Sequence, residues 1–210
     1  PASSRWWTFV PGAARSRLCD EAPELAGAPM RPPIVITGGW RTGTTFLFRL
    51  LASDPRYVWL NQYENPANPR VHAATTAASV AGAFPRLDYL FVGAGTTGTL
   101  MGCMQYFRRN RPETRIVAVD TLGSVTFGMA PGKRYIPGLG TSQRPPIFDP
   151  EGVHALELVP EAQTVAMCRH LARKGLLVGG STGTVLAAAY AWRDRLPPGA
   201  VAVALSPDWG

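Results

Sequence analysis

Three turns rich in glycine and hydroxyl side chains carry most of the chemistry that this sequence suggests. They cover residues 38–45 (GGWRTGTT), 93–98 (GAGTTG) and 179–183 (GGSTG), and each follows a short apolar run and precedes a stretch with helical spacing. Backbone N–H groups at the start of a helix bind anions, and Ser or Thr hydroxyls add further donors. The turns therefore predict sites for phosphorylated ligands.

The turn at 38–45 approaches the P-loop pattern G-x-x-x-x-G-K-[ST], but Thr44 stands where the lysine is needed, so we do not expect a nucleoside triphosphatase. The surrounding stretch PPIVITGGWRTGTTFLFRLLASDPR resembles the opening of the sulfotransferase family over residues 30–56. In that family an R-[ST]-G-[ST]-[ST] loop holds the 5′-phosphosulfate end of the sulfuryl donor. The resemblance implies binding of 3′-phosphoadenylyl sulfate by Arg41, Thr42, Gly43, Thr44 and Thr45.

The turn at 93–98 satisfies the dinucleotide pattern G-x-G-x-x-G, and Asp120 ends the next expected strand, near where the ribose-binding acid belongs. An NAD site is therefore one interpretation. Against it, Thr96, Thr97 and Thr99 surround the turn with hydroxyls, which suit a terminal phosphomonoester better than a pyrophosphate. A tight turn that binds no ligand is a third interpretation.

The turn at 179–183 places Ser181 at the start of a helix, where its hydroxyl either faces a ligand or only caps the helix.

The elements that must position these turns alternate between short β-rich runs and helix-like stretches. Such alternation predicts an α/β fold with a mostly parallel sheet and helices on both faces. In such sheets ligands bind beyond the carboxyl ends of the strands. The sequence predicts strands over 34–37, 57–60, 88–92, 115–119, 154–159, 176–178 and 200–205, helices over 44–52, 71–83, 99–109, 161–173 and 184–193, and irregular segments over 61–69 and 121–150.

Composition describes a globular chain. Of its 210 residues 46% are hydrophobic and 17% charged, which excludes disorder for most of its length. The net charge of +7 is spread along the chain, and its one cluster, Arg108, Arg109, Arg111 and Arg115, lies where a helix should end. There it complements the helix dipole, so we expect no nucleic-acid partner.

The three cysteines, Cys19, Cys103 and Cys168, are far apart and include no C-x-x-C pair. They indicate neither a disulfide framework nor a metal site, and they favour a cytoplasmic protein. The uncharged stretches 89–107 and 175–192 are long enough to cross a membrane, but each contains one of the glycine-rich turns. We therefore expect no membrane partner.

Beyond these local patterns, motifs in a fixed order over residues 57–210 resemble the cysteine synthase family of pyridoxal phosphate enzymes (fold type II). The motifs are NQYENPANP, DYLFVGAGTTGTLMG, RIVAVD, PGLGTS, VGGSTGTVLAA and VAVALSPDWG. The details are most similar to the siderophore-biosynthesis branch that makes a 2,3-diaminopropionate precursor, N-(1-amino-1-carboxyethyl)glutamate, from O-phosphoserine and glutamate. The resemblance implies a transferase or lyase of amino-acid biosynthesis that performs β-replacement on O-activated serine, with an amino-acid substrate and a homodimeric assembly.

By this resemblance the cofactor is pyridoxal 5′-phosphate, Ser181 faces its pyridine nitrogen, and Gln62 contacts the substrate. A neutral serine leaves the ring a weaker electron sink, which favours elimination of a β leaving group. The segment from Gly138 to Thr141 matches a mobile wall of the active site, and Asp120 has no required role. The residues implied to hold the cofactor phosphate are Gly95, Thr96, Thr97, Gly98 and Thr99.

The resemblance lacks one essential part, the Schiff-base lysine in its S-x-K context. The only lysines are Lys133, in a loop, and Lys174, at a helix end, and both are expected at the surface. The sequence therefore predicts a composite chain: a sulfotransferase-like opening over 1–56 and an incomplete cofactor-binding α/β domain over 57–210. Four functions remain open: a pyridoxal phosphate enzyme inactive alone, a nucleotide-sulfate binder, an NAD-binding protein and a non-catalytic partner subunit.

Overall fold

The fold is described from a computed structural model of the chain. The chain divides into two units, residues 1–59 and 60–210, and the architecture below belongs to the second. The structure describes residues 47, 50–51, 53–54 and 61–208.

In the first unit, Leu47, Leu50 and Leu51 are helical, within the helix predicted over 44–52. The strands predicted over 34–37 and 57–60 lie outside the described residues.

The second unit is built on a four-stranded sheet in the order β3-β2-β1-β4, in which every neighbouring pair is parallel. This confirms the predicted α/β class with a parallel sheet. The central pair is in register from Tyr89 opposite Arg115 to Gly93 opposite Val119. The strands are β1 (Tyr89–Gly93), β2 (Arg115–Thr121), β3 (Ala155–Val159) and β4 (Ala202–Ala204).

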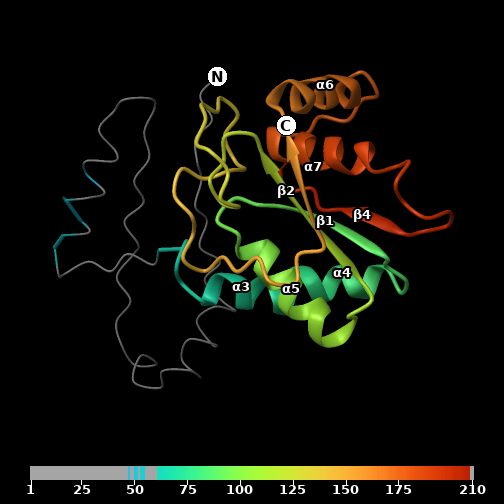
Figure 1. Ribbon diagram of the computed structural model, residues 1–210, viewed down its shortest axis with the longest axis horizontal. Coiled ribbons are helices and arrows are strands. Elements are labelled where there is room, and N and C mark those ends of the chain that lie inside the picture. Colours follow the sequence, from blue (N-terminus) through green and yellow to red (C-terminus); the bar gives the residue numbers. More distant parts are fainter. Residues whose placement is uncertain (1–46, 48–49, 52, 55–60, 209–210) are drawn as a thin grey trace. The chain divides into compact units, whose positions relative to one another are not determined.

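Helices cover both faces of this sheet, as predicted (Figure 1). One face carries a helical segment that runs without a break through α3, a π-helical turn η2 and α4, together with α5; the other face carries α6 and α7. The bounds are α3 (Ala67–His72), η2 (Ala73–Ala77), α4 (Ala78–Ala83), α5 (Gly98–Asn110), α6 (Glu161–Ala172) and α7 (Gly180–Ala191).

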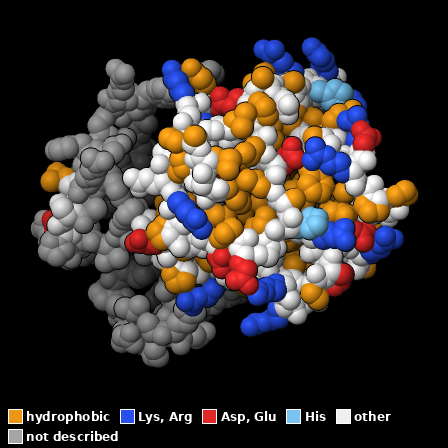
Figure 2. All heavy atoms as spheres, in the orientation of Figure 1, with side chains coloured by type: hydrophobic (Ala, Val, Ile, Leu, Met, Phe, Trp, Pro, Cys, Tyr) orange, Lys and Arg blue, Asp and Glu red, His pale blue; other side chains and the backbone are white. Residues whose placement is uncertain are grey.

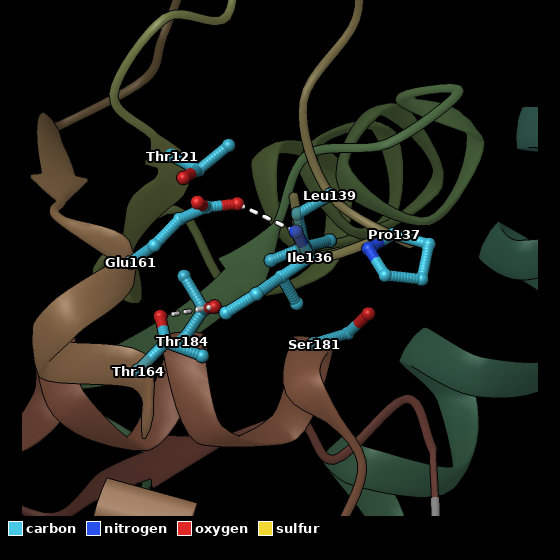
Figure 3. Close-up of a pocket in the computed structure, with 8 residues that line it drawn as sticks. All are labelled: Thr121, Ile136, Pro137, Leu139, Glu161, Thr164, Ser181 and Thr184. Atoms are coloured by element: carbon cyan, nitrogen blue, oxygen red, sulfur yellow. Dashed lines mark hydrogen bonds between the residues drawn. The ribbon is translucent and has the colours of Figure 1, made fainter. Parts of the chain in front are cut away.

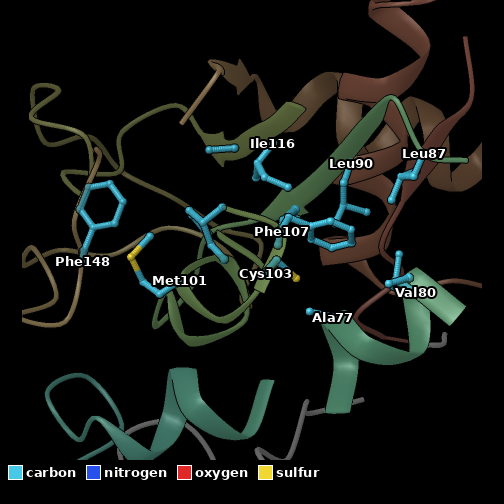
Figure 4. Close-up of a cluster of buried hydrophobic side chains, with 14 residues drawn as sticks. Ala77, Val80, Leu87, Leu90, Met101, Cys103, Phe107, Ile116 and Phe148 are labelled. Carbon is cyan, nitrogen blue, oxygen red and sulfur yellow. The ribbon is translucent and has the colours of Figure 1, made fainter. Parts of the chain in front are cut away.

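Each central strand contributes to two hydrophobic cores, because side chains along a strand alternate between the faces. From β1, Leu90 and Val92 pack towards α5 in the first core, whereas Tyr89 and Phe91 pack towards α7 in the second. Figure 4 shows the first core, where Phe107 lies beside Leu90. Burial on both faces explains why these strands read as continuous apolar runs.

The segment 61–69 was predicted to be irregular throughout, and this is wrong at its end. Helix α3 begins at Ala67, where the Asn65 side chain accepts a hydrogen bond from the Ala67 N–H at 2.9 Å. Pro69 lies in the first turn of α3. Backbone N–H groups there have no acceptor within the helix, so the missing N–H of a proline costs no hydrogen bond. The prolines therefore mark the start of a helix.

The strand predicted over 176–178 does not form, and only Val178 makes a bridge. The helix after it starts at Gly180 instead of residue 184. The glycine-rich turn is therefore mostly helix, and Ser181 lies in the first turn of α7.

The long segment between β2 and β3 is ordered around buried polar groups at the end of β2. Thr126 Oγ1 lies 2.8 Å from Thr141 Oγ1, and the Thr141 N–H donates to Ser124 Oγ at 3.0 Å. Beside them Asp120 is fully buried: its Oδ1 accepts from the Thr121 N–H at 2.8 Å. Its Oδ2 has no hydrogen-bond partner among the described residues.

Among the described residues, no helix has the length and apolar character needed to cross a membrane. The stretch 89–107 consists of β1, a turn and most of α5, as the strand–turn–helix interpretation required.

The packing of α3 and η2 on α5 generates a first prediction. A Cβ atom at Gly102 would lie 2.6 Å from both His72 Cβ and the Pro69 carbonyl oxygen. Gly102→Ala must therefore push the helices apart, and we expect a loss of about 1–3 kcal/mol in the free energy of unfolding, measured by urea denaturation. Gly82→Ala, in α4 with nothing within 4 Å of the new atom, is the matched control and should gain up to about 1 kcal/mol. Equal effects at both sites would contradict the close packing.

The buried Asp120 generates a second prediction. Burial raises the pKa of Asp120 to about 6, against smaller lowering effects of nearby donors and of Arg134. The folded state binds the proton of the Asp120 carboxyl group more tightly than the unfolded state. The contribution of this group to stability is therefore complete below pH 4 and is lost as pH rises through 6. At about 1.4 kcal/mol per pKa unit, the fall should be on the order of 2–3 kcal/mol.

Asp120→Asn removes the charge, so its free energy of unfolding should lack this fall. Urea denaturation of both proteins from pH 4 to pH 7.5 measures the difference, and parallel pH profiles would contradict the prediction.

Candidate functional site

The turn after β1 forms a cradle at the N-terminus of α5; we use this name for residues 95–99. Thr97 is the N-cap of α5 and adopts the left-handed conformation, with φ of 69°. It is the only described residue other than glycine with a positive φ. A β-branched residue there costs on the order of 1–3 kcal/mol, and such strain is typical of functional sites.

The hydroxyls of the cradle differ in their partners. Thr96 Oγ1 accepts from the Gly98 N–H at 3.4 Å and from Asn68 Nδ2 at 3.2 Å, and Thr99 Oγ1 lies 3.3 Å from His72 Nε2. Thr97 Oγ1 is buried without a hydrogen-bond partner among the described residues. Together with the N–H groups that follow Gly98 in the first helical turn, these hydroxyls form a set of donors for an anion.

Gln62 is connected to the cradle through its backbone. Asn68 Nδ2 donates both to the Gln62 carbonyl oxygen at 2.7 Å and to Thr96 Oγ1. The segment before α3 is thereby held beside the turn after β1, although the two are far apart in sequence. Gln62 and the cradle, both predicted, are thus brought together.

Ser181 lies opposite, in the first turn of α7, and is 6% exposed. The carboxylate of Asp208 caps this helix: Oδ2 accepts from the Ser181 N–H at 3.2 Å, and Oδ1 accepts from the Thr182 N–H at 2.8 Å. An acidic group at a helix N-terminus is stabilised by the helix dipole. The cap fixes the backbone that carries Ser181.

The segment 136–140 lies between the cradle and Ser181. A Cβ atom at Gly138 would lie 2.1 Å from Ser181 Oγ, and one at Gly95 would lie 2.9 Å from the Gly138 carbonyl oxygen. Glu161 holds the segment, because its Oε1 accepts from the N–H groups of Tyr135 and Ile136 at 2.7 and 2.6 Å. Figure 3 shows Ile136, Leu139 and Ser181 around the same small space.

The cavity in this space has a volume of only about 10 Å³. That is room for at most one water molecule. Because Gly138 also lies against both Gly95 and Ser181, a ligand that extends from the cradle to Ser181 requires segment 136–140 to move outward.

A larger hollow of about 380 Å³ lies elsewhere, between α5 and residues 147–152. Two of its charged side chains, Arg108 and Glu151, pair with each other at 3.2 Å and are well exposed. Neither of the two glycine-rich turns that the structure describes, 93–98 and 179–183, lines it.

Asp120, the ribose acid of the NAD interpretation, lies near the end of β2, next to the turn after β1. It is completely buried and bonded to the Thr121 backbone. In this structure it therefore presents no exposed carboxylate to a ribose hydroxyl.

Three of the four arginines in the cluster at the end of α5, Arg108, Arg111 and Arg115, make contacts within the protein. Arg111 donates to the carbonyl oxygens of Phe84 and Ala81 at 2.7 and 2.8 Å, near the C-terminus of α4. Arg115 donates to the Tyr89 hydroxyl and lies over its ring. On the face in Figure 2, basic side chains are spread among acidic ones without forming one patch.

Both lysines are exposed, as predicted, and Lys133 Nζ lies 4.7 Å from the centre of the Tyr135 ring. The two described cysteines, Cys103 and Cys168, are free thiols. Burial raises the pKa of Cys103 to about 12, which keeps this thiol protonated.

Sequence reasoning missed four residues that shape the site. Asn68 stands in a segment predicted to be irregular, and His72, Asp208 and Glu161 act through contacts distant in sequence. Only the repeated Asn-Pro pairs of NQYENPANP could have indicated one of them, Asn68, because such pairs often mark the start of a helix. The predicted sulfuryl-donor residues Arg41, Thr42, Gly43, Thr44 and Thr45 lie outside the described residues.

Comparison with known proteins identifies relatives of the whole arrangement. The chain is 38% identical over 164 residues to an N-(2-amino-2-carboxyethyl)-L-glutamate synthase of Ralstonia nicotianae, a match covering 77% of this chain and 48% of the relative. It is similar to the solved structure of an O-ureido-L-serine synthase, with a TM-score of 0.74 and 32% identity over 81% of this chain and 55% of that one.

A third similar structure is the O-acetylserine-dependent cystathionine beta-synthase of Helicobacter pylori. Its TM-score is 0.73, with 30% identity over 84% of this chain and 60% of that one. The chain thus spans about half the length of the relatives it matches.

The family profile described as pyridoxal-phosphate dependent enzyme matches residues 23–208. The match begins inside the predicted sulfotransferase-like opening, and the boundary after residue 56 stays a prediction. Over most of its length, this chain belongs to the family of pyridoxal-phosphate dependent enzymes.

Proposed function

We propose that this chain forms the cofactor-binding part of a pyridoxal phosphate enzyme that performs β-replacement on O-activated serine. The observation that carries the proposal is the cradle after β1, which faces the first turn of α7 across segment 136–140. The names of the relatives support the reaction class, since they include an O-ureido-L-serine synthase and an O-acetylserine-dependent enzyme.

The residues of the cradle fit the phosphate of the cofactor. Thr97 Oγ1 is buried without a partner among the described residues, and the hydroxyls of Thr96 and Thr99 lie at the same helix start. A phosphate monoester carries three strong acceptor oxygens and negative charge, and both complement a helix N-terminus. No acidic side chain is bonded to these hydroxyls among the described residues.

At the ring end, we propose that Ser181 faces the pyridine nitrogen. Gly138 now lies against the Ser181 hydroxyl, so segment 136–140 must move to admit the ring. Three contacts hold the segment: Glu161 binds its beginning, Leu139 packs against the second core, and the Gly140 N–H donates to the Ala94 carbonyl oxygen at 2.9 Å. Its mobility would then control access to the site.

When bound, the cofactor draws electrons from the α-carbon of the amino acid, which allows a β leaving group to depart. This chain contributes the donors that hold the phosphate, the neutral hydroxyl of Ser181 and the Gln62 segment near the substrate. Both lysines are exposed and lie outside the cradle. We therefore propose that turnover depends on a lysine outside these 210 residues.

For the nucleophile we propose the amino group of glutamate. This choice rests on the name of the Ralstonia relative, an N-(2-amino-2-carboxyethyl)-L-glutamate synthase. We propose a cytoplasmic location, which the free thiols of Cys103 and Cys168 support.

Cofactor binding tests the proposed function. The wild-type chain should bind pyridoxal phosphate and, more weakly, inorganic phosphate, measured by equilibrium dialysis and by calorimetry. The Thr96→Val, Thr99→Val double variant should bind both at least about tenfold more weakly, since it loses two hydrogen bonds to a charged group.

Thr75→Val is the matched control, because the Thr75 hydroxyl bonds only the Val71 carbonyl oxygen of its own helix, at 2.6 Å. It should leave binding unchanged. Absence of binding by the wild-type chain, or equal losses in all variants, would contradict the proposal.

We also propose a homodimer, because large apolar side chains are exposed both before the start of α7 and near its end. Leu176, Leu177 and Tyr190 are 52%, 66% and 59% exposed. Light scattering should give about twice the chain mass of 22.6 kDa. Leu177→Lys should lower the measured mass towards that of the monomer, whereas Val71→Lys, also at an exposed site, should leave it unchanged. A monomeric wild-type chain would contradict the proposal.

A further inference from the structure

The neighbours of Thr96 determine in which bonds its hydroxyl accepts and in which it donates. The Asn68 amide group that faces Thr96 also faces the Gln62 carbonyl oxygen, at 2.7 Å. A carbonyl oxygen can only accept, so this group must be the NH₂. Thr96 Oγ1 therefore accepts from Asn68 as well as from the Gly98 N–H.

With two bonds accepted, Thr96 Oγ1 has no lone pair left, because a hydroxyl offers one hydrogen and two acceptor sites. Its hydrogen remains free to donate, and no described residue accepts it. The Thr96 hydroxyl is thus set as a donor before any ligand arrives.

His72 contacts the Thr99 hydroxyl as Asn68 contacts that of Thr96. Its Nε2 lies 3.3 Å from Thr99 Oγ1, and its Nδ1 lies 3.0 Å from Thr76 Oγ1. If Thr76 donates to Nδ1, the proton of the neutral ring is on Nε2, which donates to Thr99. The Thr99 hydroxyl then donates outward, like that of Thr96.

Two glycines permit this arrangement. A Cβ atom at Gly98 would lie 2.0 Å from Asn68 Oδ1, and one at Gly102 would lie 2.6 Å from His72 Cβ. Each pair, Asn68 with His72 and Gly98 with Gly102, is spaced by four residues, so each forms one stripe on its helical segment. Asn68 and His72 therefore pack directly against the backbone of α5 at Gly98 and Gly102.

We propose that Asn68 and His72 are positioning residues that turn the hydroxyls of Thr96 and Thr99 into donors. The cradle would then select an oxyanion whose oxygens only accept, such as a fully ionised phosphate monoester. This inference rests on the proposed function, in which the ligand is the cofactor phosphate. It adds residues that do not touch the ligand and fixes the direction of each hydrogen bond.

Double-mutant cycles on binding test this proposal. Asn68→Leu keeps the approximate shape but removes the donor, and it should weaken binding of inorganic phosphate and pyridoxal phosphate about tenfold. In a Thr96→Val background the same change should have almost no effect, because Asn68 then has no hydroxyl to orient. His72→Phe with Thr99→Val forms the second cycle. Pyridoxal, which lacks the phosphate, should bind all these variants like the wild-type chain.

The outcomes separate this proposal from the proposed function. If the wild-type chain binds neither phosphate nor pyridoxal phosphate, both fail. If the wild-type chain binds both ligands, but Asn68→Leu weakens binding equally in the wild-type and the Thr96→Val backgrounds, only the positioning role of Asn68 is overturned. An equal loss for pyridoxal would overturn it too.

A measurement on the wild-type chain covers the case in which variants do not fold. Nitrogen-15 NMR distinguishes the two neutral histidine tautomers, and the chain has only three histidines. With saturating phosphate, His72 should carry its proton on Nε2. A ring protonated only on Nδ1 would overturn the proposal for His72.

Discussion

The contact between α3–η2 and α5 is the constraint on which the site depends. Gly98 and Gly102 leave the surface of α5 without Cβ atoms, so the neighbouring segment packs against its backbone. The polar side chains of Asn68 and His72 can reach the cradle hydroxyls only at this distance. A substitution at Gly102, outside the cradle, would therefore change ligand binding, because it changes which of these hydrogen bonds can form.

The carboxyl edge of the sheet holds two unfavourable features that the cores compensate. Thr97 adopts a strained backbone conformation and buries a hydroxyl without a partner, and Asp120 buries a carboxyl group whose pKa is raised to about 6. The two have different consequences. Asp120 lies among the buried polar groups of the ordered segment after β2, and its cost depends on pH, whereas the strain at Thr97 lies in the cradle itself and can be offset by a bound anion.

Segment 136–140, the wall between the cradle and Ser181, connects access to the site with the local stability of the segment itself. Glu161 at the start of α6 accepts two backbone N–H groups of this wall, and Gly138 closes over Ser181. Leu139 packs against the second core, so opening the segment would also expose apolar surface. The helices α5 and α7 on either side of it contribute residues to the two cores.

The sequence by itself determined the α/β class, the parallel sheet and three of its strands nearly to the residue, and it singled out the turn that forms the cradle. It could do so because buried strands and glycine-rich turns are local patterns. Tertiary structure decided the rest: residues 176–178 form no strand, α3 starts after Pro66, and Asn68 and Asp208 join the site. These features depend on contacts between residues far apart in the chain, such as the 28 positions from Asn68 to Thr96, and no local pattern encodes them.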